Sequence, residues 1–387
     1  MKKSINTFLK HPTKDNTNKS ANPPVVRAST ILFNSMQEMH QHEIKVKQHK
    51  KVSHYTYGRY GSTTTIELEN ILKELEKAYH VFLTGTGFGG IALALMSLCR
   101  PGDEILVSDN VYGPTKEISE KLLKEFDINA KFYDPDSFDD LKKKVTKKTK
   151  MILVENPGSI TFEFQDLSKI VNLAKKKKIL TLLDNTWGTP LYLQPLKLGF
   201  DMSFSSATKY FSGHSDAMGG SLAVNKKVFN KVMFFYKLSG YRMSADEAYL
   251  IIRGLRTLDT RLKQHYVNTK TVINFLKRQK KIKEILYPYK TSSKNYKLWK
   301  KYYSGATGLF SVVIKSKNKS SVIKFVNSLE LFGIGYSWGG FESLAILQEL
   351  RVSKDEYTQG RKFFRFNKDE HIVRLHIGLE DPKDLIN

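Results

Sequence analysis

The sequence is nearly devoid of cysteine, because Cys99 is the only one in 387 residues. A single cysteine excludes a disulfide framework within the chain. Cys99 ends the apolar stretch 91–99, a setting typical of a small buried side chain rather than of a nucleophile or ligand. Because no zinc-ligand spacing is present either, we expect no metal site.

Long apolar runs are also missing, and none approaches the ~20 residues that cross a bilayer as a helix. The start of the chain carries Lys2 and Lys3 with no apolar segment behind them, a pattern that does not support a secretory signal. We therefore expect a cytoplasmic protein that does not bind membranes.

Acidic residues are scarce relative to basic ones, with 38 Asp and Glu against 63 Lys and Arg and a net charge of +25. This excess raises the hypothesis of a basic nucleic-acid-binding protein, because such side chains neutralise phosphates. The lysine clusters at 142–144, 175–178 and 280–281 nevertheless lie beside helical patterns, as solvated helix faces do. No basic heptad or aromatic RNA-binding signature accompanies them, so nucleic acid is the less favoured partner.

The apolar content, 40% of the residues, suffices for one large domain and a smaller one. The first fifty residues are polar and contain Pro23-Pro24, which predicts an extended arm. Thr64 and Glu67 then match a capping box, and apolar residues from Leu68 to Tyr79 recur on one helical face.

Short apolar runs then alternate with helical patterns at 115–126 and 166–177. The runs, each expected to form a buried strand, are 104–108, 151–154, 179–183 and 202–205. This alternation predicts an α/β fold with a mainly parallel sheet covered on both faces. A long helix at 245–273 and strands at 309–314 and 372–377 predict a smaller mixed domain with an antiparallel sheet.

Polar residues follow two of these runs, where ligands bind in such folds. Lys209 can form an imine only as a neutral amine, which a partly desolvated site near other cations favours. Asp184 either caps the turn after it or, in a pyridoxal site, pairs with the pyridinium nitrogen. Ser206 and Thr208 flank the lysine with hydroxyls suited to a phosphate.

A glycine-rich loop at 84–90 precedes the helix expected from Ile91. Glycines at a helix start let backbone N–H groups approach an anion such as phosphate. The loop matches neither a Walker motif nor a dinucleotide fingerprint, and a tight structural turn is the alternative.

Four stretches resemble the signature segments of the Cys/Met metabolism family of pyridoxal 5′-phosphate (PLP) enzymes, fold type I. They are Asp184–Trp187, Ser206–Tyr210, Gly213–Asp216 and Arg253–Leu258. The similarity runs from about residue 22 to residue 380 and implies PLP as cofactor. It also implies a PLP-dependent transferase-like α/β fold with helices on both faces of a mainly parallel sheet. The expected parts are an N-terminal arm, a PLP-binding domain and a C-terminal α/β domain, at 1–55, 56–244 and 245–387.

The resemblance implies roles for single residues. Lys209 matches the Schiff-base lysine, which also carries the proton in catalysis, and Asp184 matches the pyridinium partner. Tyr112 matches the aromatic residue that stacks on the cofactor ring, and it is expected to assist proton transfer. Gly87 and Phe88 match the pair whose backbone amides hold the phosphate, although the family usually has methionine where Phe88 stands.

Three further assignments concern charge and assembly. Arg374 matches the arginine that binds the substrate α-carboxylate, whereas the residues alone suggest a strand-edge surface charge. Tyr57 and Arg59 resemble residues that reach the phosphate of a neighbouring subunit, and a cation–π contact is the alternative for Arg59. The family implies a homotetramer of two dimers with shared active sites.

Two stretches favour one reaction within the family. Residues 157–163 and 336–343 are similar to bacterial cystathionine β-lyases, while γ-acting relatives usually carry leucine where Trp338 stands and asparagine near Ser159. With Ser337 and Trp338 at the substrate, the expected reaction is L-cystathionine plus water to L-homocysteine, pyruvate and ammonia, in methionine biosynthesis. Cystathionine γ-synthase and methionine γ-lyase are the nearest alternatives, and alanine racemisation is a possible second activity.

Overall fold

The computed structural model describes residues 4–11, 20–48, 55–350, 360–364 and 367–387. The strands are His80–Thr84 (β1), Glu104–Ser108 (β2), Asn129–Tyr133 (β3), Thr149–Glu155 (β4), Leu180–Asp184 (β5), Met202–Ser206 (β6), Gly220–Val224 (β7), Ile282–Leu286 (β8), Leu309–Lys315 (β9), Leu344–Gln348 (β10) and Glu370–His376 (β11). The helices before β7 are Ile5–Lys10 (α1), Met36–Lys47 (α2), Gly58–Tyr60 (η1), Thr63–Glu76 (α3), Gly87–Leu98 (α4), Gly113–Glu117 (α5), Ile118–Leu122 (η2), Leu123–Glu125 (α6), Phe138–Lys144 (α7), Leu167–Lys177 (α8), Thr189–Tyr192 (α9) and Pro195–Leu198 (α10). The helices after β7 are Lys226–Ser239 (α11), Ala245–Leu255 (α12), Leu258–Leu276 (α13), Lys294–Tyr302 (α14) and Lys319–Asn327 (α15).

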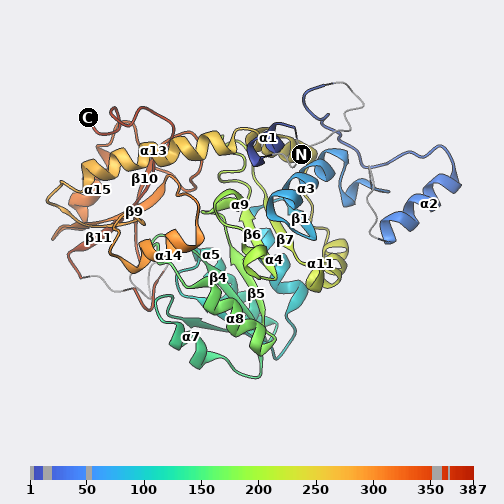
Figure 1. The fold of residues 1–387 in the computed structure, drawn as a ribbon, viewed down its shortest axis with the longest axis horizontal. Coiled ribbons are helices and arrows are strands. Elements are labelled where there is room, and N and C mark those ends of the chain that lie inside the picture. Colours follow the sequence, from blue (N-terminus) through green and yellow to red (C-terminus); the bar gives the residue numbers. More distant parts are fainter. Residues whose placement is uncertain (1–3, 12–19, 49–54, 351–359, 365–366) are drawn as a thin grey trace.

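Seven strands form the central sheet, in the order β1-β7-β6-β5-β4-β2-β3 (Figure 1). Neighbouring strands are parallel from β6 to β3, whereas β7 is antiparallel to both β1 and β6. The prediction of an α/β fold with a mainly parallel sheet is therefore confirmed.

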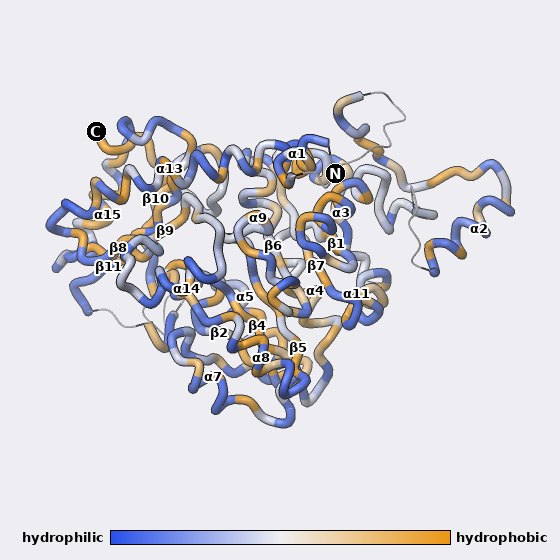
Figure 2. Tube along the Cα trace, in the orientation of Figure 1, coloured by the Kyte–Doolittle hydropathy of each residue, from blue (hydrophilic) through white to orange (hydrophobic). Residues whose placement is uncertain are grey.

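Alternating side chains of the central strands enter different cores, as the twofold repeat of a strand requires. Ile105 and Val107 of β2 pack in one cluster with buried residues of α4 and α11. Leu106, between them, packs in another cluster with residues of α8 and of the second sheet. Figure 2 shows hydrophobic residues gathered along these strands and hydrophilic residues on the outer helices and loops. Both faces of the sheet are thus covered.

The second sheet has the order β10-β11-β9-β8 and is antiparallel throughout, as the sequence predicts. The helix expected at 245–273 is instead two helices, α12 and α13, because Thr257 leaves helical geometry. At this break the Gly254 carbonyl accepts hydrogen bonds from the Thr257 N–H at 3.2 Å and from Arg261 Nη2 at 2.7 Å.

The N-terminal segment is less extended than predicted, since it contains α1 and α2 and buries Leu9. In Figure 1, α2 projects away from the two sheets. The predicted capping box of Thr64 is wrong, because Ser62 and Thr65 form that box. Thr64 instead donates its hydroxyl hydrogen to the Pro24 carbonyl at 2.8 Å, which fastens the N-terminal segment to α3.

Within the described residues, no helix combines the length and the apolar character that crossing a membrane demands. The lysines at the end of α8 are exposed, in agreement with a solvated helix face, and they lie where the helix dipole favours positive charge.

Helix α12 packs directly on the turn that follows β6. A Cβ atom on Gly254 would lie 2.1 Å from the carbonyl oxygen of Ser212 and 2.3 Å from that of Phe211. Glycine therefore permits this contact, which supports the turn that carries Lys209.

We predict that Gly254→Ala lowers the free energy of unfolding by about 1–3 kcal/mol, because α12 must move off that turn. Urea unfolding followed by circular dichroism measures the change. Gly335→Ala is the matched control, since nothing lies within 4 Å of its Cβ position. Equal unfolding midpoints for the two variants would contradict the packing argument.

Candidate active site

Lys209 lies in the turn after β6, with its amine directed at the second sheet. Its Nζ donates a hydrogen bond to Ser337 Oγ at 2.5 Å and lies 5.5 Å from the centroid of the Trp338 ring. Burial lowers the pKa of Lys209 to about 8, Arg374 adds to the lowering and Asp184 opposes it. The amine is therefore partly neutral near physiological pH, as imine formation requires.

Asp184 ends β5, and its carboxylate is buried. Oδ1 accepts hydrogen bonds from the Thr186 backbone N–H at 2.9 Å and the Thr186 hydroxyl at 2.6 Å, so the turn-capping interpretation is correct. Burial raises the pKa of Asp184 to about 6, although Thr186 and Lys209 oppose this rise. Within the described residues Oδ2 has no donor, which leaves it available to a cationic ring nitrogen.

One pocket joins the two sheets. Asp184 and Glu155 line it from the central sheet, and Arg374 and Trp338 line it from the side of the second sheet. Its remaining lining residues are Pro157, Gly158, Ser159, Ile160, Phe162, Thr186, Trp187 and Leu309. The residue stretches 157–163 and 336–343, which the sequence associates with the substrate, thus both contribute to one cavity.

Arg374 lies on β11, the second strand from one edge of its sheet, and is buried. The alternative of a strand-edge surface charge is therefore wrong. Its Nη2 donates to the Ser337 carbonyl at 3.1 Å, and burial lowers the pKa of Arg374 to about 10 while Tyr112 and Tyr336 oppose the lowering. The other N–H groups of the guanidinium suit a carboxylate in the pocket.

The segment around Ser337 is held in an unusual conformation. Ser337 has a φ of 81°, which is uncommon for a residue with a side chain. Trp338 packs on the Tyr210 ring at 5.4 Å, and the Gly339 N–H donates to His376 Nε2 at 3.2 Å. These contacts keep Ser337 Oγ beside the amine of Lys209.

Tyr112 has a half-exposed side chain, and its backbone N–H donates to Glu155 Oε2 at 2.6 Å. Glu155 was not predicted from the sequence. It is the register partner of Asp184, and burial together with Asp184 raises the pKa of Glu155 well above its ordinary value. The signal was available, because Glu155 follows the run 151–154 as Asp184 follows 179–183.

The expected phosphate residues come from two segments that meet. Helix α4 begins at Gly87 rather than at Ile91, with Thr86 as its N-cap. A Cβ on Gly87 would lie 2.3 Å from Ser206 Oγ, so the two residues are in close contact. The N–H groups of Gly87 and Phe88 precede the first intrahelical bond and find no acceptor in the described part of the chain, which suits an anion.

Thr208 is already engaged by the chain itself. Its hydroxyl donates to the Gly219 carbonyl at 3.3 Å and accepts from the Gly219 N–H at 3.0 Å. A phosphate contact from Thr208 therefore stays a prediction and competes with these bonds.

Tyr57 and Arg59 are not brought to this pocket by their own chain. The Arg59 guanidinium lies over the rings of Tyr57 and Tyr60, at 5.8 and 5.2 Å from their centroids. The cation–π alternative is thus present in one subunit, and the contact with a neighbouring subunit stays a prediction.

The candidate site as a whole fits PLP in four respects. An amine with a lowered pKa, a free carboxylate oxygen, two free helix-start N–H groups and the Ser206 hydroxyl are the groups that its aldehyde, ring nitrogen and phosphate need. Among the described residues, no group of three or more histidine, cysteine or acidic side chains is arranged to hold a metal ion.

The comparisons with known proteins agree with PLP as the cofactor. The family described as Cys/Met metabolism PLP-dependent enzyme matches residues 6–387. A cystathionine β-lyase of Bordetella avium is 36% identical over 391 residues, covering 99% of this chain and 96% of that protein. An L-alanine/L-glutamate racemase of Wolbachia pipientis is 33% identical, covering 95% and 91%. The structure of cystathionine γ-synthase from Xanthomonas oryzae matches with a TM-score of 0.89 at 26% identity, covering 100% and 96%.

We predict that the nucleophilicity of Lys209 in the cofactor-free protein rises with pH about a midpoint near 8. Acylation followed by peptide mass mapping at each pH measures this, with exposed Lys176 as internal reference. Asp184→Asn should lower the midpoint, because Asp184 favours the charged amine, and Arg374→Leu should raise it. A midpoint above pH 10 in the unsubstituted protein would refute the desolvation argument.

Proposed function

This chain belongs to the Cys/Met metabolism family of PLP-dependent enzymes, and we propose that it is a cystathionine β-lyase. The reaction is L-cystathionine plus water to L-homocysteine, pyruvate and ammonia. The observation that carries the proposal is a pocket lined by Asp184, Arg374 and Trp338, with the Lys209 amine 5.5 Å from the centroid of the Trp338 ring. The similarity to the Bordetella enzyme over nearly the whole chain supports the choice within the family.

Each residue performs a defined task in this proposal. Bound PLP supplies an electron sink for the pair left when Cα loses its proton. Arg374 holds the α-carboxylate by its guanidinium, which the Ser337 carbonyl orients. Lys209 Nζ, with its pKa near 8, takes the Cα proton, and Ser337 Oγ keeps the amine on that side of the pocket.

Elimination then breaks the bond between Cβ and sulfur. The leaving homocysteine thiolate needs a proton, and Lys209 Nζ carries the one taken from Cα, with Tyr112 as the second group able to donate. Water converts the remaining three-carbon fragment to pyruvate and ammonia. Trp338, packed on Tyr210, forms an aromatic wall that restricts the shape of the substrate.

A second candidate activity is amino-acid racemisation, and one observation favours it. The relative from Wolbachia is named an L-alanine/L-glutamate racemase and is 33% identical. Racemisation needs only removal of the Cα proton and its return to the opposite face. The γ-acting reactions need an additional proton removal from Cβ. The basic nucleic-acid-binding alternative does not account for a partly buried lysine beside a pocket that a buried aspartate and a buried arginine line.

We predict that Lys209→Ala lowers kcat/KM for cystathionine by about 10³-fold or more, because it removes both cofactor anchor and proton carrier. Its visible absorption band should also be lost. Pyruvate release measures turnover, and Lys176→Ala is the control because that lysine is exposed on α8. The unsubstituted enzyme should be assayed with cystathionine, cystine, methionine, O-succinylhomoserine and alanine. Preference for any of the last three over cystathionine would reject the β-lyase assignment.

We also propose a homotetramer of two dimers, in which Tyr57 and Arg59 complete the phosphate site of a neighbouring subunit. Arg59→Ala should then weaken retention of PLP, measured by dialysis and absorbance. In equal mixtures with Lys209→Ala, refolded together, about a quarter of the activity should return, because half the dimers are hybrid and each holds one intact site. No recovery, with hybrid dimers verified by mass spectrometry, would exclude the shared site.

A further inference from the structure

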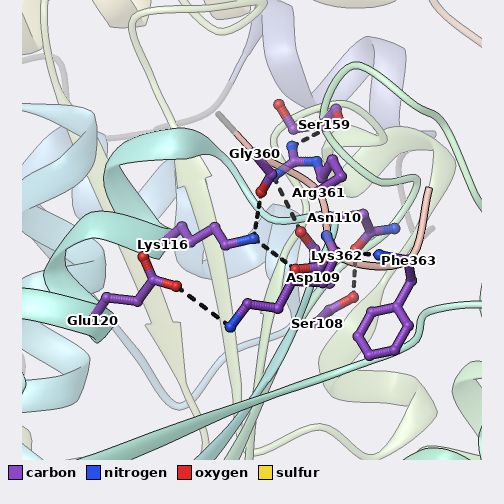
Figure 3. A network of polar contacts seen from close by, with 10 residues as sticks. All are labelled: Ser108, Asp109, Asn110, Lys116, Glu120, Ser159, Gly360, Arg361, Lys362 and Phe363. Carbon is purple, nitrogen blue, oxygen red and sulfur yellow. Dashed lines mark hydrogen bonds and ion pairs between the residues drawn. The ribbon is translucent and has the colours of Figure 1, made fainter. Parts of the chain in front are cut away.

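Residues Gly360–Phe364 are here called the strap, and Gly360 to Phe363 lie beside Asp109 and Asn110, at the start of the loop Asp109–Tyr112 (Figure 3). The Asp109 carboxylate is the centre of the contact. Its Oδ1 accepts a hydrogen bond from Lys116 Nζ at 2.6 Å, and its Oδ2 accepts from the backbone N–H groups of Lys362 at 2.6 Å and Phe363 at 3.2 Å. Lys116 Nζ also donates to the Gly360 carbonyl at 2.6 Å. The strap is therefore bound to the loop through one buried carboxylate.

Arg361 connects this loop to a wall of the pocket. Its Nη1 donates to the Asp109 carbonyl at 3.1 Å, and its Nη2 donates to the Ser159 carbonyl at 3.1 Å. Its backbone N–H donates to the Leu350 carbonyl at 3.1 Å, shortly after β10. One planar guanidinium thus fixes the spacing between the loop that ends in Tyr112 and the Ser159 segment that lines the pocket.

The charges around Arg361 extend the connection to Tyr112. Burial lowers the pKa of Arg361, while the carboxylates of Glu163, Glu155 and Asp109 oppose the lowering. Glu155 is the residue that accepts the Tyr112 N–H. Burying the cations Lys116 and Arg361 together with the nearby carboxylates costs desolvation free energy. The ion pairs in this cluster therefore contribute little net free energy to folding. Geometry is the better account of its presence.

The Tyr112 ring is half exposed, and the polar contacts of its backbone help to fix its position. Its N–H is held by Glu155, and the preceding Asn110 carbonyl accepts the Ser159 N–H at 2.8 Å. The loop is thus bound by Ser159, which Arg361 contacts directly, and by Glu155, whose negative charge Arg361 favours.

We propose that Arg361, acting with Asp109, is a positioning residue that sets the place of the Tyr112 ring in the active site. The proposal rests on the role proposed above for Tyr112. The strap transmits the position of the second sheet, which carries Arg374, to the loop of the central sheet. Arg361 itself is not among the residues that line the pocket.

Arg361→Lys tests the proposal, because it keeps the charge but cannot bond both carbonyls with one planar fork. We expect kcat to fall about 10- to 100-fold with KM changed less than about twofold, since Arg374 is untouched. The visible circular dichroism of bound PLP should also weaken. Lys362→Ala is the matched control, because only the backbone of Lys362 bonds Asp109 and its side chain is largely exposed. We expect this control to behave as the unsubstituted enzyme.

A double-mutant cycle with Tyr112→Ala separates positioning from general damage. In that background Arg361→Lys should have no further effect on the dichroism or on kcat. Wild-type dichroism and kinetics for Arg361→Lys would overturn the proposal, as would an undiminished effect without the Tyr112 ring. If Tyr112→Ala alone leaves the dichroism unchanged, the role of Tyr112 fails, whichever substrate the enzyme uses.

Discussion

The amine of Lys209 is partly shielded from water between two sheets, and the other features of the site follow from that constraint. A desolvated ammonium loses its proton more easily, and Arg374 adds to this effect. Asp184 works in the opposite sense, so the pKa near 8 is a balance of burial against charge. The two sheets must therefore keep a fixed position relative to each other. The Lys209–Ser337 hydrogen bond, the bond from Trp187 Nε1 to the Leu309 carbonyl and the Arg361 contacts are among the polar links that hold them around the pocket.

The general fold was predictable because buried parallel strands are continuous apolar runs, and the same rule located Asp184 and Lys209. It failed at helix boundaries, which depend on tertiary contacts. Helix α4 begins early, over Gly87, because a glycine is tolerated against Ser206. The predicted single helix at 245–273 is interrupted at Thr257, where Arg261 bonds the Gly254 carbonyl, a contact that no local pattern reveals.

The site residues likewise divide into those with a local sequence signal and those placed only by tertiary contacts. Arg374 has no local signal, since a charged residue in an apolar strand reads as a surface position until its sheet is known. Glu155 had the signal of Asp184 and was overlooked, because only strand register shows that the two are neighbours. The role of Arg361 was even harder to predict, because the two carbonyls that its guanidinium contacts lie about 200 residues or more earlier in the chain. Chain topology, which sequence periodicity does not contain, brings them together.

The adjacent carboxylates Glu155 and Asp184 explain how one pocket can both hold the cofactor ring nitrogen and position Tyr112. Burial and the neighbouring Asp184 raise the pKa of Glu155 well above its ordinary value, although the Tyr112 N–H and Arg361 oppose the rise. Lys209 and the Thr186 hydrogen bonds favour the charged form of Asp184, whereas Glu155 gains its main partner from the Tyr112 N–H. Asp184 is therefore the acid of this pair whose neighbours favour the anion that a cationic ring nitrogen needs. The different roles of the two acids, Asp184 toward the ring nitrogen and Glu155 toward the Tyr112 N–H, thus follow from their neighbours rather than from their residue type.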